Sequence, residues 1–178
     1  TQIKLFCRWL EQQRAIVTCR DPGGTQLGEM VRDIVLKDFE TPIARTSEML
    51  LYMASRAQLV HQVVRPALTA GAAVVCDRYL LANVVYQGHA GGLDVQQLWE
   101  VGELAVGGLH PDLTIVLDMD VAEAQRRLNR KPDRMEAQGT EFLEQVRRGF
   151  LEEAQGDRER IVVVNANQPV DDVQRDVR

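Results

Sequence analysis

The sequence predicts an α/β fold, a doubly wound parallel sheet flanked by helices. Four short apolar runs alternate with segments of helical periodicity, and each run ends at a polar residue. Continuous apolar runs are typical of strands that are buried on both faces, and helical crossovers between strands make a sheet parallel. The length of 178 residues suits one domain with a substantial core. We therefore expect a single domain over residues 1–178.

The individual elements follow from the spacing of apolar side chains. Ile3, Phe6 and Leu10 recur at helical spacing and predict a first helix. Gly71 predicts the end of a long helix, because glycine commonly follows the last helical turn. The expected strands span residues 15–19, 72–76, 113–117 and 161–164. The expected helices span residues 1–14, a stretch up to 36, 45–70, 80–86, 94–107, 121–130, 140–155 and a final stub.

Composition excludes several classes of function. Lys and Arg number 21 against 26 Asp and Glu, and the net charge of −5 argues against a nucleic-acid coat or a polybasic membrane patch. No apolar run approaches the roughly 18 residues of a membrane span, and no signal sequence opens the chain. The cysteines and histidines are scattered without metal-site spacing. We expect a cytoplasmic protein, and any anion that it binds is expected to be held by a local group of basic residues.

Two polar clusters follow expected strands, where a doubly wound sheet binds its ligands. The first spans residues 20–25, in which two glycines let the backbone approach a ligand and Arg20 offers planar donors for a phosphate. The second begins at Asp77, and helical spacing brings Arg78, Asn83 and Tyr86 to one side. Taken alone, the first cluster is better explained as a plain turn, because Pro-Gly and Gly-Gly pairs are typical of turns. For the second cluster, a surface ion pair beside a core aromatic is about as good an explanation as a binding site.

Two further groups carry weaker signals. Tyr52 and Arg56 lie four residues apart on the long helix, so that a ring and a guanidinium share a face and could hold a base. A core tyrosine beside an exposed arginine is the commoner explanation of such a pair. The last group gathers arginines around a Lys-Pro break, a density that suits polyphosphate or a solvated helix face. These are Arg126, Arg127, Arg130 and Arg134.

In this order, the clusters resemble the thymidylate kinase family of P-loop nucleoside monophosphate kinases. Each piece is short, but the ordered set spans nearly the whole chain. The matching segments are residues 20–25, Glu48 with 50–52 and 56–58, 77–79 with 86–88, 111–113 with Leu117 and Asp118, and 133–136. The resemblance implies a P-loop NTPase-like fold and ATP-dependent phosphorylation of dTMP to dTDP, a step toward dTTP, with Mg²⁺ present. It also implies a homodimer.

The resemblance assigns roles at the dTMP site. Tyr52 is expected to stack on thymine and Arg56 to reach the edge of the base. Asn83 and Gln87 add polar contacts to the base, and Tyr86 lies against the sugar and disfavours a 2′-hydroxyl.

At the phosphate end the resemblance assigns Arg78 and Arg20 to the dTMP phosphate and places Asp77 near the metal, directly or through water. Phosphoryl transfer depends mainly on positioning and charge neutralisation, which arginines supply. A lid at residues 130–140 is expected to close over ATP. In addition to Arg78, the resemblance assigns catalytic roles to the lid arginines Arg127, Arg130 and Arg134.

The sequence departs from the family pattern at several positions. Asp21 stands where the family usually has Glu, Ala82 where Ser is common, and Asn165 where Asp is common. The P-loop motif G-x-x-x-x-G-K-S/T is absent, and residues 1–3 resemble the stretch directly after it. We therefore expect a chain without the first, central strand and the P-loop, cut also at its C-terminus. The parent is then the enzyme, and the chain as given is expected to be inactive.

Two alternatives stay open at this point. One is a related nucleoside monophosphate kinase with another base specificity, and the other is a non-catalytic doubly wound binding module. The helix at 94–107 is broadly apolar, which suggests an interface between subunits or, equally, ordinary core packing.

Overall fold

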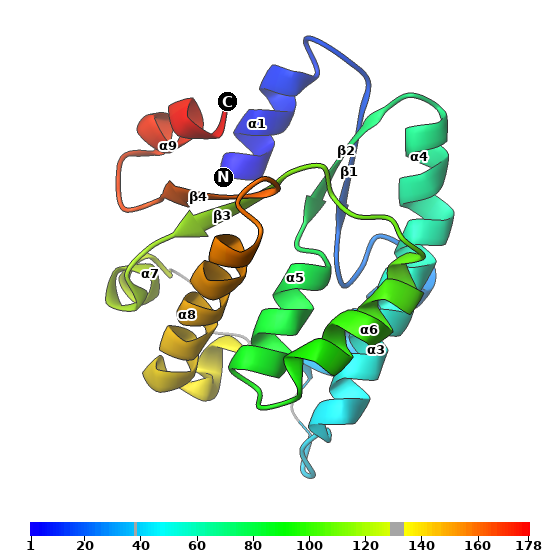
Figure 1. Cartoon of the computed structure of the whole chain (residues 1–178), viewed down its shortest axis with the longest axis vertical. Helices are drawn as coiled ribbons and strands as arrows, with labels where there is room; N and C mark the ends of the chain where they lie inside the picture. Colours follow the sequence, from blue (N-terminus) through cyan, green and yellow to red (C-terminus); the bar gives the residue numbers. More distant parts are fainter. Residues whose placement is uncertain (38, 129–133) are drawn as a thin grey trace.

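The computed structural model describes residues 1–37, 39–128 and 134–178. Its strands pair in parallel and helices flank them (Figure 1), which confirms the predicted α/β class. Every predicted strand is present within one residue of its expected bounds. The strands are β1 (Ile16–Arg20), β2 (Ala73–Asp77), β3 (Thr114–Asp118) and β4 (Ile161–Asn165). The helices are α1 (Gln2–Leu10), α2 (Gln26–Leu36), α3 (Arg45–Leu59), α4 (Arg65–Thr69), α5 (Leu80–Asn83), α6 (Val95–Val106), α7 (Val121–Arg127), α8 (Thr140–Gly156) and α9 (Val170–Val177), with π-helical turns η1 (Val60–Val64) and η2 (Val84–His89) and a 3₁₀ turn η3 (Glu136–Gln138).

The strands form two parallel pairs. β1 pairs with β2, β3 pairs with β4, and no ladder joins the two pairs within the described residues. In the registers Arg20 lies opposite Asp77 and Asp118 lies opposite Asn165, so polar residues end both pairs on the carboxyl side. The further strand and P-loop that the resemblance adds before residue 1 stay a prediction.

The predicted helix ends have identifiable causes. The Thr25 hydroxyl accepts a hydrogen bond from the Gly28 N–H at 2.9 Å and begins α2, as an N-cap does. Gly71, which follows the C-cap residue Ala70 of α4, has φ of +79°, which confirms the predicted glycine stop. The long helix expected over 45–70 is interrupted by the π turn η1, and the shorter one at 80–86 continues as the π turn η2. Such turns frequently mark functional sites.

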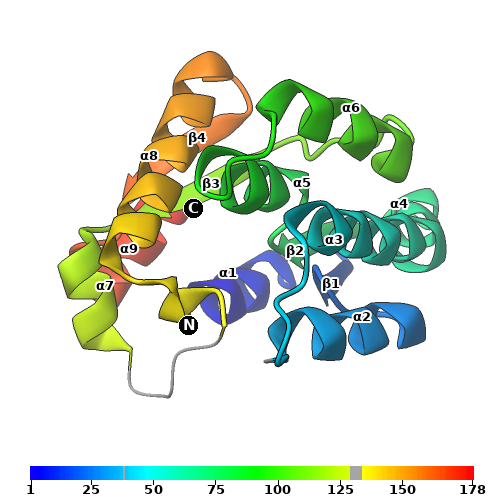
Figure 2. The ribbon, with the colours of Figure 1, turned by 90° about the horizontal axis from the view of Figure 1, so that it is seen from below.

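The core consists of two clusters that share α5. One side of α5 packs against α3 and α6, and the other packs against α8, so that α5 lies between these helices (Figure 2). The first cluster contains Met49, Met53, Leu80, Val84, Leu98 and Val106. The second contains Leu81, Val85, Met135, Phe142 and Val146. Packing on both sides fixes α5 and η2, which carry the predicted residues Asn83, Tyr86 and Gln87.

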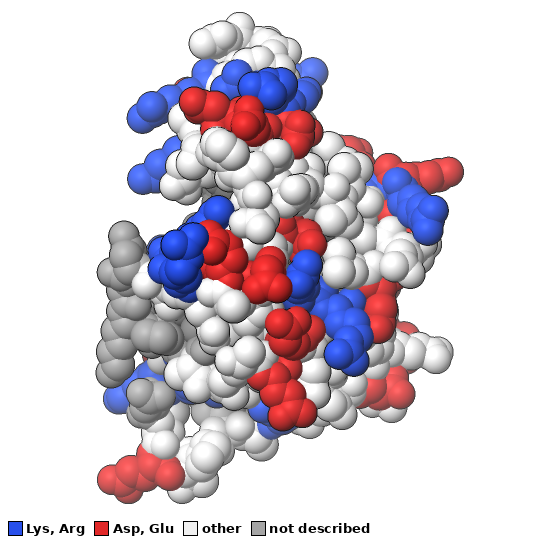
Figure 3. Space-filling view, turned by 90° about the vertical axis from the view of Figure 1, so that its left-hand side faces the viewer, with Lys and Arg blue, Asp and Glu red and all other residues white. Residues whose placement is uncertain are grey.

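Burial of the strands is less complete than the apolar runs predict. Leu117 of β3 and both Val162 and Val163 of β4 are 42% exposed. The described helices therefore cover the faces of β3 and β4 only in part. On the face drawn in Figure 3, basic and acidic side chains are interspersed and form no extended basic surface. No helix among the described residues is long and apolar enough to cross a membrane.

Candidate active site

A pocket of about 290 Å³ lies at the carboxyl ends of β1 and β2. It brings together every residue that the sequence analysis assigned to substrate or metal, from four separate segments of the chain. Those residues are Arg20, Tyr52, Arg56, Asp77, Arg78, Asn83, Tyr86 and Gln87. Asp21, Pro22, Arg32, Leu36, Tyr79, Ala82 and Met135 complete the lining. The predicted crevice outside the strand ends therefore exists.

One end of the pocket is formed by a buried ion pair. Arg56 on α3 is 2% exposed, and its Nε donates to Oδ2 of Asp21 at 2.6 Å. Burial raises the pKa of the Asp21 carboxyl, although the charge and the hydrogen bond of Arg56 oppose that shift. Oδ1 of Asp21 has no hydrogen-bond partner among the described residues. A buried acceptor of this kind is available to a ligand.

Two buried amides continue from this ion pair. Arg56 donates through NH1 to Oδ1 of Asn83 at 3.1 Å, and Nδ2 of Asn83 donates to Oε1 of Gln87 at 2.6 Å. Nε2 of Gln87 in turn donates to Oε1 of Glu48 at 2.8 Å. Asn83 and Gln87 lie one turn apart where α5 passes into η2, and Glu48 lies on α3. Four side chains thus form one continuous hydrogen-bonded chain.

The other end of the pocket is exposed and cationic. Arg20 donates to Oε2 of Glu29 at 2.6 Å, and Glu29 accepts the Gly24 N–H through Oε1 at 2.8 Å. These hydrogen bonds, from Gly24 first and then Arg20, lower the pKa of the Glu29 carboxyl. Arg32 on α2 donates to the carbonyl of Pro22 at 3.1 Å. The glycine-rich turn is thereby held in place between two arginines that line the pocket.

Arg78 has an unusual backbone conformation at the mouth of the pocket. Its φ of +69° lies in the left-handed region, which non-glycine residues adopt at a cost and which is enriched at functional sites. The exposed guanidinium lies 4.8 Å from the ring centroid of Tyr86. Tyr86 itself packs against Phe142 and Phe150 of α8, with centroid distances of 6.2 and 6.3 Å. Because Phe142 and Phe150 pack against Tyr86, the ring that contacts the Arg78 guanidinium is itself held in place.

The two lid arginines that the structure describes, Arg127 and Arg134, do not line this pocket. Arg127 donates to Glu123, to the Ala166 carbonyl at 3.1 Å and to Asn167, which places it at the β4–α9 connection. Arg134 donates through Nε to the Val35 carbonyl at 2.8 Å and through NH2 to Glu48.

The predicted position Arg130 and part of the expected lid at 130–140 lie outside the described residues. The catalytic roles of these arginines stay predictions.

Three functional neighbours were missed by the sequence analysis. Arg32 lines the pocket, Glu29 braces Arg20, and Glu48 ends the amide chain. Glu29 lies four residues after the N-cap Thr25, in the first turn of α2. An acidic residue at that position is favoured by the helix dipole, and its closeness to the glycine-rich turn could have been inferred from the sequence. Glu48 belonged to a quoted segment but received no role, because helical spacing alone does not show that a glutamate is buried.

The pocket could hold a divalent cation only with help from a ligand. The described residues contain no group of three metal-ligating side chains. Asp77 is exposed at the end of β2, where it lies opposite Arg20 in the strand register and directly precedes Arg78. Mg²⁺ commonly takes one or two carboxylates together with substrate phosphates and water. Asp77 fits that role as a single protein ligand.

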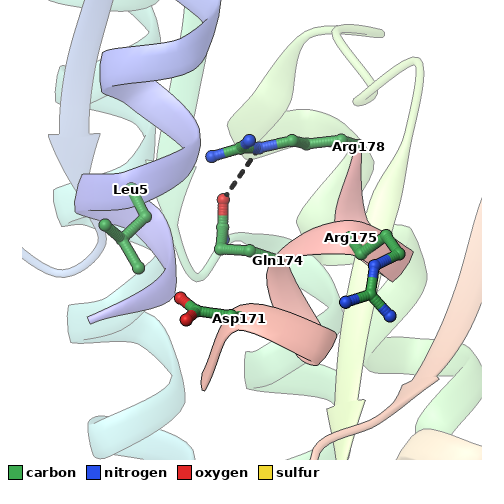
Figure 4. A pocket seen from close by; sticks show the side chains of 5 residues that line it. All are labelled: Leu5, Asp171, Gln174, Arg175 and Arg178. Atoms are coloured by element: carbon green, nitrogen blue, oxygen red, sulfur yellow. Dashed lines mark hydrogen bonds between the residues drawn. The ribbon is translucent and has the colours of Figure 1, made fainter. Parts of the chain in front are cut away.

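A second hollow lies between α1 and α9, away from the strand ends. Figure 4 shows its lining side chains Leu5, Asp171, Gln174, Arg175 and Arg178. Gln174 accepts from Nε of Arg178 at 3.3 Å and donates to Gln2 of α1, so its polar groups mainly tie the two helices together. None of the predicted site residues that the structure describes contributes to its lining.

Comparisons with known proteins cover nearly the whole chain. The family model described as thymidylate kinase matches residues 1–177. The thymidylate kinase of Symbiobacterium thermophilum is 41% identical over 181 residues, which cover 100% of this chain and 84% of the relative. The thymidylate kinase of Deinococcus radiodurans is 42% identical over 176 residues, which cover 98% of this chain and 85% of the relative.

A solved structure agrees with these sequence relatives. The crystal structure of thymidylate kinase from Ehrlichia chaffeensis is similar with a TM-score of 0.80 and 26% sequence identity. The match covers 99% of this chain and 87% of the other.

Proposed function

Because the chain belongs to the thymidylate kinase family, we propose that it serves the transfer of the γ-phosphoryl group of ATP to dTMP, which yields dTDP. The observation that carries this proposal is the polarity of the pocket. One end offers buried neutral amides and a buried ion pair, and the other offers exposed arginines. A nucleoside monophosphate has the same polarity, with a neutral base at one end and a dianionic phosphate at the other.

At the buried end we assign the base. Arg56 is a donor for a carbonyl oxygen, and Asn83 retains one lone pair on Oδ1 for an N–H group. Tyr52, on the same helix face as Arg56, lines the pocket and supplies a ring for stacking. Tyr86 is fixed by its aromatic neighbours and is assigned to the sugar, where it disfavours a 2′-hydroxyl.

At the exposed end we assign the phosphate. Arg78 and Arg20 can each offer planar paired donors to phosphate oxygens, and Arg32 adds a third positive charge. Asp77 would hold Mg²⁺, directly or through water, and the ion would neutralise charge on the phosphates. The residues of the chain align the accepting oxygen and offset its charge, which is most of what phosphoryl transfer requires of a protein.

For ATP the proposal is coarser. We assign the lid arginines Arg127, Arg130 and Arg134 to the donor side, following the family resemblance. The printed sequence contains no G-x-x-x-x-G-K-S/T motif, and no residue of it is assigned to the triphosphate cradle. A cytoplasmic location suits an enzyme of nucleotide synthesis and belongs to the same proposal.

The test is a calorimetric titration of the protein with dTMP, dUMP, UMP, AMP and GMP. We expect dTMP to bind most tightly, and a protein that also carries a P-loop to convert it to dTDP with ATP and Mg²⁺. Tighter binding of a purine monophosphate would overturn the base assignment. Equal binding of all five ligands would favour a different function for the pocket.

The homodimer is a further part of the proposal. The predicted interface helix α6 turns most of its apolar side chains into the core, although Leu104 is 85% exposed. A clearer stripe lies on α2, where Leu27, Met30 and Ile34 share one face at helical spacing and are 43%, 59% and 41% exposed. We expect Met30→Glu to shift the mass in sedimentation from dimer to monomer. A wild-type monomer would contradict this.

A further inference from the structure

Glu48 is a fully buried carboxylate without an assigned role. It is 0% exposed, and it does not line the pocket. Oε1 accepts from Gln87, while Oε2 accepts from Arg134. Arg45 lies on the same helix, with NH1 3.9 Å from Oε1. A buried charge is costly unless hydrogen-bonded partners surround it, so a glutamate retained here requires an explanation.

The hydrogen-bonded chain from Arg56 to Glu48 has a single consistent direction. A guanidinium can only donate, and an ionised carboxylate can only accept. Each amide between them could by itself lie either way round. With a donor at one end and an acceptor at the other, only one arrangement of Asn83 and Gln87 satisfies all three hydrogen bonds.

We propose that Glu48 is a positioning residue that selects thymine over cytosine by fixing which way the Gln87 and Asn83 amides lie. This inference rests on the proposed dTMP site. In the fixed arrangement Oδ1 of Asn83 is held on the Arg56 side, next to the donors of the guanidinium. The pocket therefore presents an acceptor beside donors at its buried end.

That pattern distinguishes the two pyrimidines. The edge of thymine offers an N3–H donor and the O4 acceptor, while cytosine offers an N3 acceptor and an amino donor. A reversed Asn83 would turn its amino group toward Arg56 and would oppose one donor with another, so Arg56 and Glu48 enforce the same orientation from the two ends of the hydrogen-bonded series. Glu48 acts through two intervening side chains and makes no contact with the base itself. Buried polar groups that lose their partners discriminate strongly between such ligands.

The experiment compares dTMP and dCMP dissociation constants in the wild-type protein and its Glu48→Gln variant. A glutamine at this position can donate or accept, so it no longer fixes the donor-to-acceptor direction of the hydrogen bonds through Gln87 and Asn83. We expect the ratio of the dCMP to the dTMP constant to fall roughly ten-fold, with part of the change in tighter dCMP binding. The Val106→Ala variant, which creates a cavity at the C-terminal end of α6 and removes none of the four hydrogen-bonded side chains, serves as control. It should lower the melting temperature and leave the ratio unchanged.

A rescue separates positioning from packing. In the double variant Glu48→Gln with Gln87→Glu, position 87 supplies the acceptor-only group for Asn83, and the new glutamine can donate to it. We expect the selectivity ratio to recover toward the wild-type value. If Glu48→Gln fails to fold, the Gln87→Met variant provides a second test. It removes the hydrogen bonds between Asn83 and Glu48 while Glu48 stays in place, and we expect the same loss of selectivity.

The inference is overturned if every variant changes both dissociation constants by the same factor, or if the ratio stays at the wild-type value. Those outcomes leave the proposed dTMP site intact, because the wild-type protein still prefers dTMP. A wild-type protein that does not prefer dTMP over dCMP would instead contradict the proposed function itself.

Discussion

Two arginine–carboxylate pairs border the same pocket with the same separation of 2.6 Å, yet their surroundings differ. The Arg56–Asp21 pair is almost completely buried, whereas about half of each side chain is exposed in the Arg20–Glu29 pair. Burial makes the first pair expensive to break, because either partner alone would be an unpaired charge in the interior. Water replaces a lost partner in the second pair. Environment, and not distance, therefore decides what each pair contributes.

The division suits the two ends of a nucleotide. A rigid buried end can read the edge of a base, since its donors and acceptors do not rearrange. An exposed end can exchange weak contacts for a phosphate at little cost, because Arg20 and Arg78 are already solvated. The same pocket thus combines stability at the base end with availability at the phosphate end.

The largest expected effect comes from breaking the buried pair. Arg56→Met leaves the Asp21 carboxylate buried without a cation, and we expect a loss of about 3–5 kcal/mol in the free energy of unfolding. Urea denaturation measures it. The matched control Arg20→Met breaks the exposed pair and should cost less than about 1 kcal/mol. Equal losses in the two variants would contradict the contrast between the pairs.

The second effect concerns binding at the exposed end. Arg78→Met removes charged hydrogen bonds to the phosphate, each worth about 1.5–3 kcal/mol, and should raise the dTMP dissociation constant by about ten-fold or more. Calorimetry with thymidine, which lacks the phosphate, provides the control and should show little change. Unchanged dTMP affinity would remove Arg78 from the site.

The smallest effect is a pH dependence. The pKa of Glu29 is lowered in the folded protein, so the group stabilises the fold above its unfolded pKa of roughly 4.3, and this contribution is lost as pH falls through the lowered value. We expect the difference in unfolding free energy between wild type and Glu29→Gln to be present at pH 7 and to vanish in acid. Urea titrations across this range measure it. A difference that grows on acidification has the wrong sign.

The sequence predicted the strands well but ended all four of them one residue too early. Apolar runs stop before Arg20, Asp77 and Asp118, whereas the ladders include these polar residues. The backbone hydrogen bonds of a strand do not depend on side-chain polarity, so a hydrophobic pattern underestimates strands that end at a binding crevice. Parallel pairing was predictable from the helical crossovers. The separation into two pairs was not.

The site was predictable to the extent that its residues belong to local motifs. Residues at strand ends and at helical spacing, such as Arg78 with Asn83, converge on one pocket as expected. Arg32 was missed because local spacing does not show that its side of α2 lines the pocket. Glu48 was missed because its contact with Gln87 joins α3 to η2, which are far apart in the sequence. Arg127 illustrates the reverse limit, since an arginine-rich segment does not show which loop each guanidinium reaches.

The orientation of the nucleotide is the central claim, and co-crystals with 5-bromo-dUMP test it most directly. The bromine replaces the thymine methyl group, and its anomalous signal locates the base independently of the phosphate. We predict a bromine peak at the buried end, on the side of Tyr52, Arg56 and Asn83, with the phosphate between Arg20 and Arg78. A bromine peak at the exposed arginines, or a ligand outside this pocket, would contradict the account.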